Sequence, residues 1–235
     1  ADVLGLHFFS PANVMTLLEI VRGAETAPEV MATALKLARR LGKQPVMVGV
    51  CHGFVGNRML QVRNAALSQL LLEGASPDQI DAAFRAFGWP MGPCQMQDLA
   101  GLDIGWRNRK ALGETDALPD RLCELGRLGQ KAGKGWYLYD DSRKPQPDPE
   151  VDAIIAEIAE RGGIARRVVA DAEIIERTHG PMIEEGRRIL DEGIAARSSD
   201  IDVVWTHGYG FPRGRGGQMY WDDHLREKAQ EKKKV

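Results

Sequence analysis

Two side chains near the start of the chain have the chemistry of a general base and its supporting acid. His7 lies in the apolar run that ends at Phe9, and Glu19 lies in the next apolar run. A carboxylate beside a histidine orients the imidazole and stabilises the imidazolium that forms when the ring takes a proton. The same pair is also typical of a buried histidine held in a structural ion pair. The two residues by themselves leave both interpretations open.

Two predicted strands must position this pair. Residues 3–9 and 16–21 are short apolar runs separated by a break that contains Pro11, which is typical of two buried strands joined by a loop. His7 and Glu19 then lie at strand edges and face one crevice, which is where ligands bind in an open α/β sheet.

A helix and a third strand are predicted to follow. Residues 26–29 read Thr-Ala-Pro-Glu, which predicts a capping box with proline in the first turn, and Gly42 predicts the end of the helix. Residues 45–50 then form a strand. A strand, a helix and a parallel strand make a right-handed crossover unit at the edge of a doubly wound sheet.

The chain becomes helical from Asn57 onward. Apolar residues recur at helical spacing up to the stop at Glu73 and Gly74, and residues 76–79 predict a second capping box. The short helix that follows is predicted to end at Gly88. Residues 144–150 contain three prolines and are the most linker-like stretch.

Part of this helical region recurs further along the chain. Residues 190–193, 199–202 and 210–214 parallel residues 72–74, 79–81 and 88–92. Small insertions separate the blocks, as expected of a duplicated helical domain whose loops have drifted. The shared residues are mostly helix stops and turn formers, which favours a role in maintaining the fold.

Four ordered motifs resemble one enzyme family. His-Phe-Phe-x-Pro-Ala followed by Met-x-Leu-x-Glu, at residues 7–19, is similar to the catalytic segment of the L-3-hydroxyacyl-CoA dehydrogenase family, and residues 53–58, 88–93 and 129–137 agree with it in the family's order. The resemblance extends to about Trp221. It is greatest to the dehydrogenase part of the multifunctional fatty-acid β-oxidation enzymes of the enoyl-CoA hydratase/3-hydroxyacyl-CoA dehydrogenase type.

The resemblance implies roles for single residues. His7 takes the proton of the substrate's 3-hydroxyl while hydride passes to NAD, and Glu19 supports the imidazolium. Asn57 and His207 match positions where relatives contact substrate, and Ser10 lies near the nicotinamide. Plainer interpretations remain, because Asn57 would also suit a helix N-cap and His207 a surface or core histidine.

The predicted fold class is mainly α, with two similar all-helical units preceded by the C-terminal strands and helix of a truncated Rossmann α/β domain. The expected limits are residues 1–50 for the Rossmann remnant, 51–145 for the first helical unit and 146–235 for the second. The family's Gly-x-Gly-x-x-Gly turn, which holds the pyrophosphate of NAD, does not occur in this sequence. We therefore expect the C-terminal portion of an NAD-dependent 3-hydroxyacyl-CoA dehydrogenase, inactive by itself.

The expected partners are the 3-hydroxyacyl-CoA substrate, the missing N-terminal part of the same polypeptide and a second copy of the chain. A competing hypothesis is a non-catalytic helical binding or dimerisation module. A weaker one is a β-hydroxyacid type of dehydrogenase, but those enzymes place a lysine where this chain has no suitable motif.

Composition bounds the remaining possibilities. A net charge of −2 gives no field that favours nucleic acid or an anionic membrane surface, and the lysines at 232–234 are expected to be a solvated tail. No apolar run approaches the roughly 18 residues of a transmembrane helix. Three widely spaced cysteines show no metal-ligand spacing and no disulfide pattern, so we expect no metal site and a reducing, cytoplasmic location.

Overall fold

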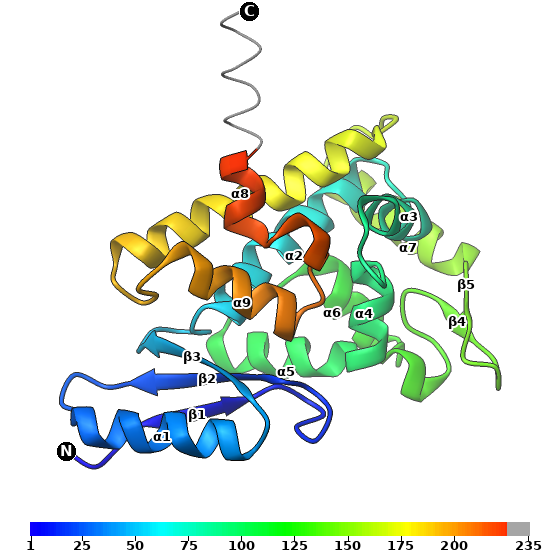
Figure 1. The fold of residues 1–235 in the computed structure, drawn as a ribbon. Coiled ribbons are helices and arrows are strands. Elements are labelled where there is room, and N and C mark those ends of the chain that lie inside the picture. Colours follow the sequence, from blue (N-terminus) through cyan, green and yellow to red (C-terminus); the bar gives the residue numbers. More distant parts are fainter. Residues whose placement is uncertain (225–235) are drawn as a thin grey trace, which may run out of the picture. The chain divides into compact units, whose positions relative to one another are not determined.

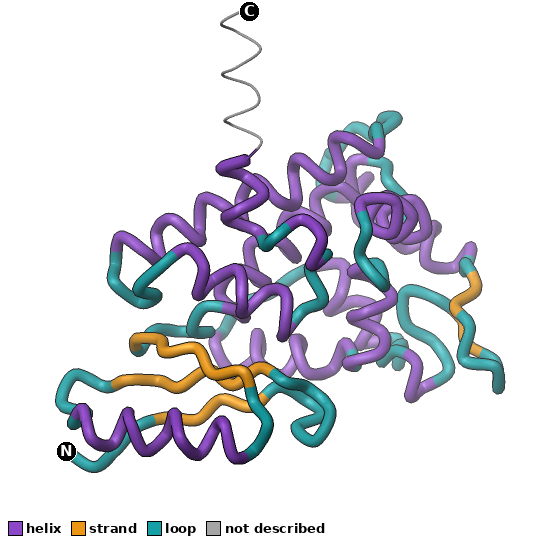
Figure 2. The backbone as a smooth tube through the Cα atoms, in the orientation of Figure 1, coloured by secondary structure: helices purple, strands orange, loops and turns teal. Residues whose placement is uncertain are grey.

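The structure is a computed structural model that describes residues 1–224, and it is mainly helical (Figure 2). Its residues form two units, the first made of residues 1–63 with those from 179 onward and the second of residues 64–178. The borders fall inside two helices, α2 (Gly56–Glu73) and α8 (Asp171–Asp191). The predicted mainly α class is confirmed, whereas the predicted domain limits stay a prediction. The lysines at 232–234 lie outside the described residues.

A small mixed sheet forms the N-terminal part of the first unit. Its strands are β1 (Gly5–Phe8), β2 (Leu17–Arg22) and β3 (Gln44–Gly49), in that spatial order. β1 pairs antiparallel with β2, β3 pairs parallel with β2, and helix α1 (Pro28–Arg40) connects β2 to β3. The predicted strand, helix and parallel strand are therefore present.

The central strand β2 presents two different faces. Leu18 and Ile20 pack with Met31 and Ala34 of α1 in one buried cluster. Because side chains alternate along a strand, Glu19 must point to the opposite face. Helix α9 (Ser198–Gly208) packs against β2 and β3 there, and Figure 1 shows α1 and α9 on opposite sides of the sheet.

The capping box predicted at the start of α1 is wrong. The N-cap is Ala27, which makes no side-chain cap, and Pro28 occupies the first turn. The Thr26 hydroxyl instead donates to the carbonyl of Val3 at 2.7 Å and accepts from the Gly23 amide at 2.9 Å. Thr26 therefore ties the N-terminal segment to the turn after β2, a long-range role that a local capping pattern does not reveal.

The second unit is built from short helices and one small hairpin. Its remaining elements are α3 (Pro77–Phe87), α4 (Pro93–Ala100), α5 (Leu102–Leu112), α6 (Ala117–Glu124), α7 (Pro149–Arg161), the 3-10 turn η1 (Gln130–Ala132), and strands β4 (Leu138–Tyr139) and β5 (Pro145–Gln146). The predicted cap of α3 is confirmed, because the Ser76 side chain accepts from the Gln79 amide at 3.1 Å. The linker-like stretch is ordered here, since it contains β5.

The described part of the chain contains no helix long and apolar enough to cross a bilayer. Within residues 1–224, no group of three or more histidine, cysteine, aspartate or glutamate side chains is placed to hold a metal ion.

Candidate active site

The sheet brings His7 and Glu19 together as direct cross-strand neighbours. The register pairs the Cα atoms of His7 in β1 and Glu19 in β2, so both side chains leave the sheet on the same face. His7 Nδ1 lies 2.7 Å from Glu19 Oε2; the glutamate side chain is fully buried and the histidine side chain is 28% exposed. Among the described residues His7 Nε2 makes no hydrogen bond. A carboxylate on Nδ1 holds the proton there and leaves Nε2 as the basic nitrogen.

Glu19 also holds the start of helix α2. Its other oxygen, Oε1, accepts the backbone amides of Val55 at 3.2 Å and Gly56 at 3.1 Å. These are donors that a helix start leaves without an intrahelical partner. One carboxylate therefore joins β1, β2 and α2, and with both oxygens engaged it is fixed in orientation toward His7.

Two aromatic rings enclose the imidazole. The ring centroids of Phe9 and Phe54 lie 4.7 Å and 5.5 Å from that of His7. Phe54 has a positive φ of 48°, directly after Gly53 with a φ of 74°. A Cβ at Gly53 would lie 2.8 Å from the amide nitrogen of Arg58, so glycine is required for this tight turn into α2. The turn aims the Phe54 ring at His7.

Asn57 lies one residue inside α2 and is not the N-cap that local spacing suggests. Its Oδ1 accepts a hydrogen bond from the Tyr209 hydroxyl at 2.8 Å. Glu19 already satisfies the first amides of the helix, which leaves the Asn57 side chain available for another role. Burial raises the pKa of Tyr209 well above its ordinary value, and the Glu19 charge raises it further, so the phenol remains a protonated donor.

The remaining predicted residues lie around the loop between β1 and β2. His207, in the last turn of α9, places Nδ1 3.2 Å from the Thr16 hydroxyl. Burial lowers the pKa of His207 and the Arg213 guanidinium lowers it further, which favours a neutral ring. Ser10 is exposed and, within the described residues, makes no hydrogen bond through its hydroxyl. The structure thus pairs His7 with Glu19 and leaves Ser10 and His207 outside that contact.

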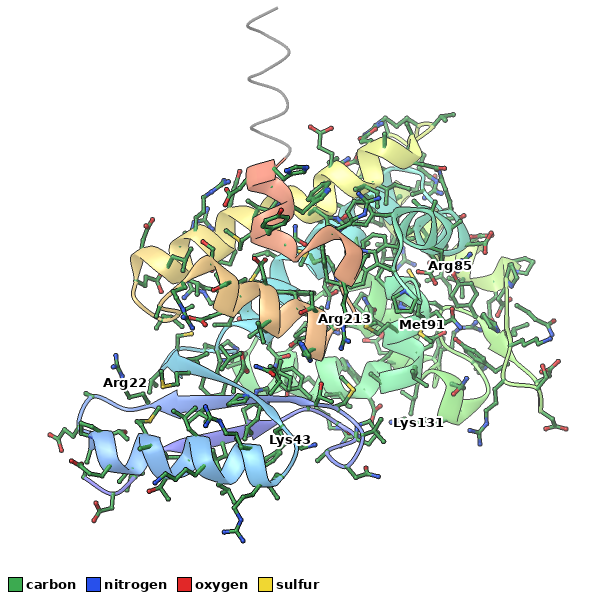
Figure 3. The ribbon with its side chains drawn as sticks, viewed as in Figure 1. Arg22, Lys43, Arg85, Met91, Lys131 and Arg213 are labelled. Carbon is green, nitrogen blue, oxygen red and sulfur yellow. The ribbon has the colours of Figure 1, made fainter. Side chains whose placement is uncertain are left out.

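Sequence reasoning did not single out Lys43, although it anchors this loop. Its ammonium donates to the carbonyl oxygens of Ala12 at 2.5 Å and Met15 at 2.7 Å, and Figure 3 labels it at the turn from α1 into β3. Tyr209 was not singled out either. No local pattern marks either residue, because each acts through a contact far away in sequence.

A histidine and a buried carboxylate on neighbouring strands form a site that can accept a proton, and comparisons with known proteins identify the family that has it. Residues 1–51 match the 3-hydroxyacyl-CoA dehydrogenase NAD binding domain, and residues 53–139 match the C-terminal domain of the same family. The chain belongs to the 3-hydroxyacyl-CoA dehydrogenase family, as its motifs predict.

Particular relatives sharpen this assignment. The chain is 46% identical to the peroxisomal bifunctional enzyme of Danio rerio over 93% of this chain and 33% of that protein, and 38% identical to a glyoxysomal fatty acid β-oxidation multifunctional protein of Brassica napus over 96% and 33%. The dehydrogenase part of multifunctional enzyme 1 from C. elegans superposes with a TM-score of 0.68 at 35% identity, covering 91% of this chain and 50% of that one. The chain spans about a third of the length of the curated relatives it matches.

The comparisons correct one prediction. A cytoplasmic location is wrong, because the relatives from Danio rerio and Brassica napus are named as peroxisomal and glyoxysomal proteins. The prediction rested on three cysteines without a disulfide pattern. That observation separates oxidising from reducing surroundings but does not tell one reducing compartment from another.

Proposed function

We propose that this chain forms part of an NAD-dependent L-3-hydroxyacyl-CoA dehydrogenase that oxidises 3-hydroxyacyl-CoA to 3-oxoacyl-CoA in fatty-acid β-oxidation. The observation that carries the proposal is the hydrogen bond between His7 Nδ1 and Glu19 Oε2, held by the first amides of α2. The names of the relatives support a peroxisomal location. They support the dehydrogenase over a non-catalytic helical module.

His7 is the proposed general base. Its Nε2 takes the proton of the substrate's 3-hydroxyl, and the new positive charge on the ring lies beside the Glu19 carboxylate. Phe9 and Phe54 keep water from the ring on two sides. Asn57 positions the acyl group through its side-chain amide, while His207 binds substrate beside the Thr16 loop and Ser10 lies near the nicotinamide.

The residues of this chain do not include the glycine-rich turn that binds the pyrophosphate of NAD. Between β2 and α1 the chain reads Gly-Ala-Glu-Thr-Ala, which does not supply the glycine-rich turn that approaches a pyrophosphate. NAD, when bound by the whole protein, supplies the hydride acceptor. The 235 residues by themselves are therefore expected to bind NAD weakly or not at all.

We propose that residues 1–50 are the end of a Rossmann domain and that residues 51–145 and 146–235 are two related helical units. The match of residues 1–51 and 53–139 to two consecutive domains supports the first of these limits. The N-terminal part of the same polypeptide and a second copy of the chain are the proposed protein partners.

The experiment that tests the function is turnover of 3-hydroxyacyl-CoA with NAD by the whole protein and by its His7→Gln variant. Removing a general base typically lowers the rate by about 10²- to 10⁴-fold. His52→Gln is the matched control, because His52 is exposed and its imidazole contacts Gln61 rather than a carboxylate. Near-normal turnover by a correctly folded His7→Gln enzyme would contradict the assignment.

A further inference from the structure

The phenol of Tyr209 contacts the proposed substrate-binding amide from inside the first unit. Tyr209 follows directly after α9 and is 8% exposed. Its ring stacks on Trp205 with centroids 4.3 Å apart and meets Phe9 edge-on at 5.5 Å. Phe9 in turn contacts the His7 ring. Tyr209 is thus part of the aromatic cluster beside the proposed base, and its hydroxyl is the one polar atom that reaches Asn57 from that cluster.

Two glycines make this placement sterically feasible. A Cβ at Gly56 would lie 2.6 Å from Cε2 and 2.7 Å from the hydroxyl oxygen of Tyr209. A Cβ at Gly208 would lie 2.5 Å from Cδ2 of Leu17 in β2. Real side chains do not approach so closely, so the start of α2 and the end of α9 both depend on glycine to seat the phenol against Asn57.

The bond favours one orientation of the Asn57 amide. An asparagine side chain carries one acceptor oxygen and one NH₂ donor at nearly equivalent positions. The Tyr209 hydroxyl donates to Oδ1 at 2.8 Å. A half-turn of the amide would let Nδ2 donate to the phenol oxygen, but it would leave the buried phenol hydrogen without its acceptor. With Oδ1 occupied, the other end of the amide is Nδ2, which can only donate.

We propose that Tyr209 is a positioning residue that holds the Asn57 amide so that Nδ2 is presented as a donor to an oxygen of the acyl-CoA substrate. The inference rests on the proposed function, because it takes Asn57 as a substrate contact. It adds a residue that acts through Asn57 and does not itself touch substrate.

The test compares Tyr209→Phe with wild type in the whole protein, using acetoacetyl-CoA as the binding probe in calorimetry and steady-state kinetics for turnover. Phenylalanine keeps the ring packing and removes only the hydroxyl. Loss of one neutral hydrogen bond that orients a donor should weaken probe binding by about 3- to 10-fold and raise KM more than it lowers kcat. In an Asn57→Ala background the same substitution should have no further effect, because Tyr209 then has no amide to orient.

The matched control is Tyr139→Phe, which removes a hydroxyl that donates to Asp98 at 2.9 Å in the second unit. It should lower stability and leave KM unchanged. If the wild-type protein bound the probe and Tyr209→Phe bound it equally well, this inference alone would be wrong. An equal loss in the Asn57→Ala background would also overturn it, because the phenol would then act through packing. If the wild-type protein failed to bind the probe, the proposed function itself would be wrong.

Discussion

Residues 76–95 of the second unit and residues 197–220 of the first build the same local structure around a buried aspartate. Asp81 accepts the amides of Cys94 and Gln95 at 2.8 and 2.9 Å, and Asp202 accepts those of Met219 and Tyr220 at 2.7 and 3.2 Å. In each case a short helix, α3 or α9, carries the aspartate, and a glycine-containing turn leads to the capped amides.

The two regions also share their closest packing. A Cβ at Gly92 would lie 2.2 Å from the Asp81 carboxyl carbon, and a Cβ at Gly217 would lie 2.2 Å from the Asp202 Cβ. The missing Cβ at Gly92 and at Gly217 therefore lets a carboxylate reach the next helix, whereas a Cβ at Gly214, which the sequence pattern pairs with Gly92, would meet nothing within 4 Å. This supports a structural interpretation of the repeated residues.

The differences between the regions are more informative about function. The region of Asp202 has Tyr209 where the region of Asp81 has Phe87, each directly before the turn glycine. It also has a longer turn that carries the 3-10 segment η2 (Arg213–Arg215); Figure 3 labels Arg213 there. The region of Asp81 instead gains a third donor, the Tyr137 hydroxyl, at 2.8 Å. The region of Asp81 thus has an additional buried hydrogen bond. The region of Asp202 instead places Tyr209 beside Asn57 and His207 beside Thr16.

The largest difference that we expect between the two regions is in how much each buried aspartate stabilises the fold. Asp81→Ala leaves two amides and the Tyr137 hydroxyl without their acceptor, and we expect it to lower the free energy of unfolding by about 3 kcal/mol. Asp202→Ala leaves only two amides without their acceptor and should lower the free energy of unfolding by about 2 kcal/mol. Urea denaturation measures both. A larger loss for Asp202→Ala would mean that the two caps are not equivalent.

The second prediction concerns pH, because the region of Asp81 lies beside a second buried acid, Asp98. Burial raises the pKa of Asp98 to about 6, and the charge of Asp81 adds to the shift. The unfolded chain releases this proton at lower pH, so the contribution of Asp98 to stability is present below its unfolded pKa and is lost as pH rises through about 6.

The matching measurement is urea denaturation of wild type and Asp98→Asn at about pH 4.5 and about pH 7. The wild-type protein should lose on the order of 2 kcal/mol relative to the variant between these conditions. Asparagine has one acceptor oxygen instead of two, so the variant also weakens the hydrogen bonds from the amides of Trp136 and Tyr137. That loss of unfolding free energy does not depend on pH. A difference that stays constant with pH would contradict the raised pKa.

The smallest expected effect lies at the two helix starts. Ser76 caps α3 through its side chain, whereas Arg197 at the start of α9 makes no side-chain cap. Ser76→Ala should cost about 1 kcal/mol of unfolding free energy. Arg197→Ala should cost less than about 0.5 kcal/mol, because its exposed ion pair with Asp200 contributes little. Equal losses in thermal denaturation would show that the cap at Ser76 is not the difference between the helices.

Local features of the fold could be predicted from the sequence, since they depend on neighbouring residues. Gly88 ends α3 and Ser76 begins it because the φ angle and the side-chain oxygen act within one turn. The capping box predicted at Thr26 is wrong, and the alternative N-cap role of Asn57 does not hold, for a shared reason. Each side chain is engaged by a residue far away in sequence, Thr26 by Val3 and Asn57 by Tyr209, and no local pattern contains that information.

The candidate active site also has features that the sequence predicts and features that only the tertiary structure shows. His7 and Glu19 stand in a motif whose order and spacing pointed to a pair, and the strand register places them opposite each other. The double role of Glu19 could not be predicted, because the amides that it accepts belong to a helix that begins well beyond α1 and β3. The sequence identifies the reactive groups, and the tertiary structure identifies what orients them.

The most direct test of the proposed base is turnover by Glu19→Gln, His7→Gln and the double variant of the whole protein. Glutamine can keep an oxygen on the α2 amides but then presents NH₂ to His7 Nδ1, which moves the ring proton to Nε2 and removes the base. Each single variant should lower kcat by about 10²- to 10⁴-fold, and the double variant should be scarcely worse than His7→Gln, because the two residues act as one unit. Near-normal turnover by Glu19→Gln, or losses that multiply in the double variant, would contradict the account.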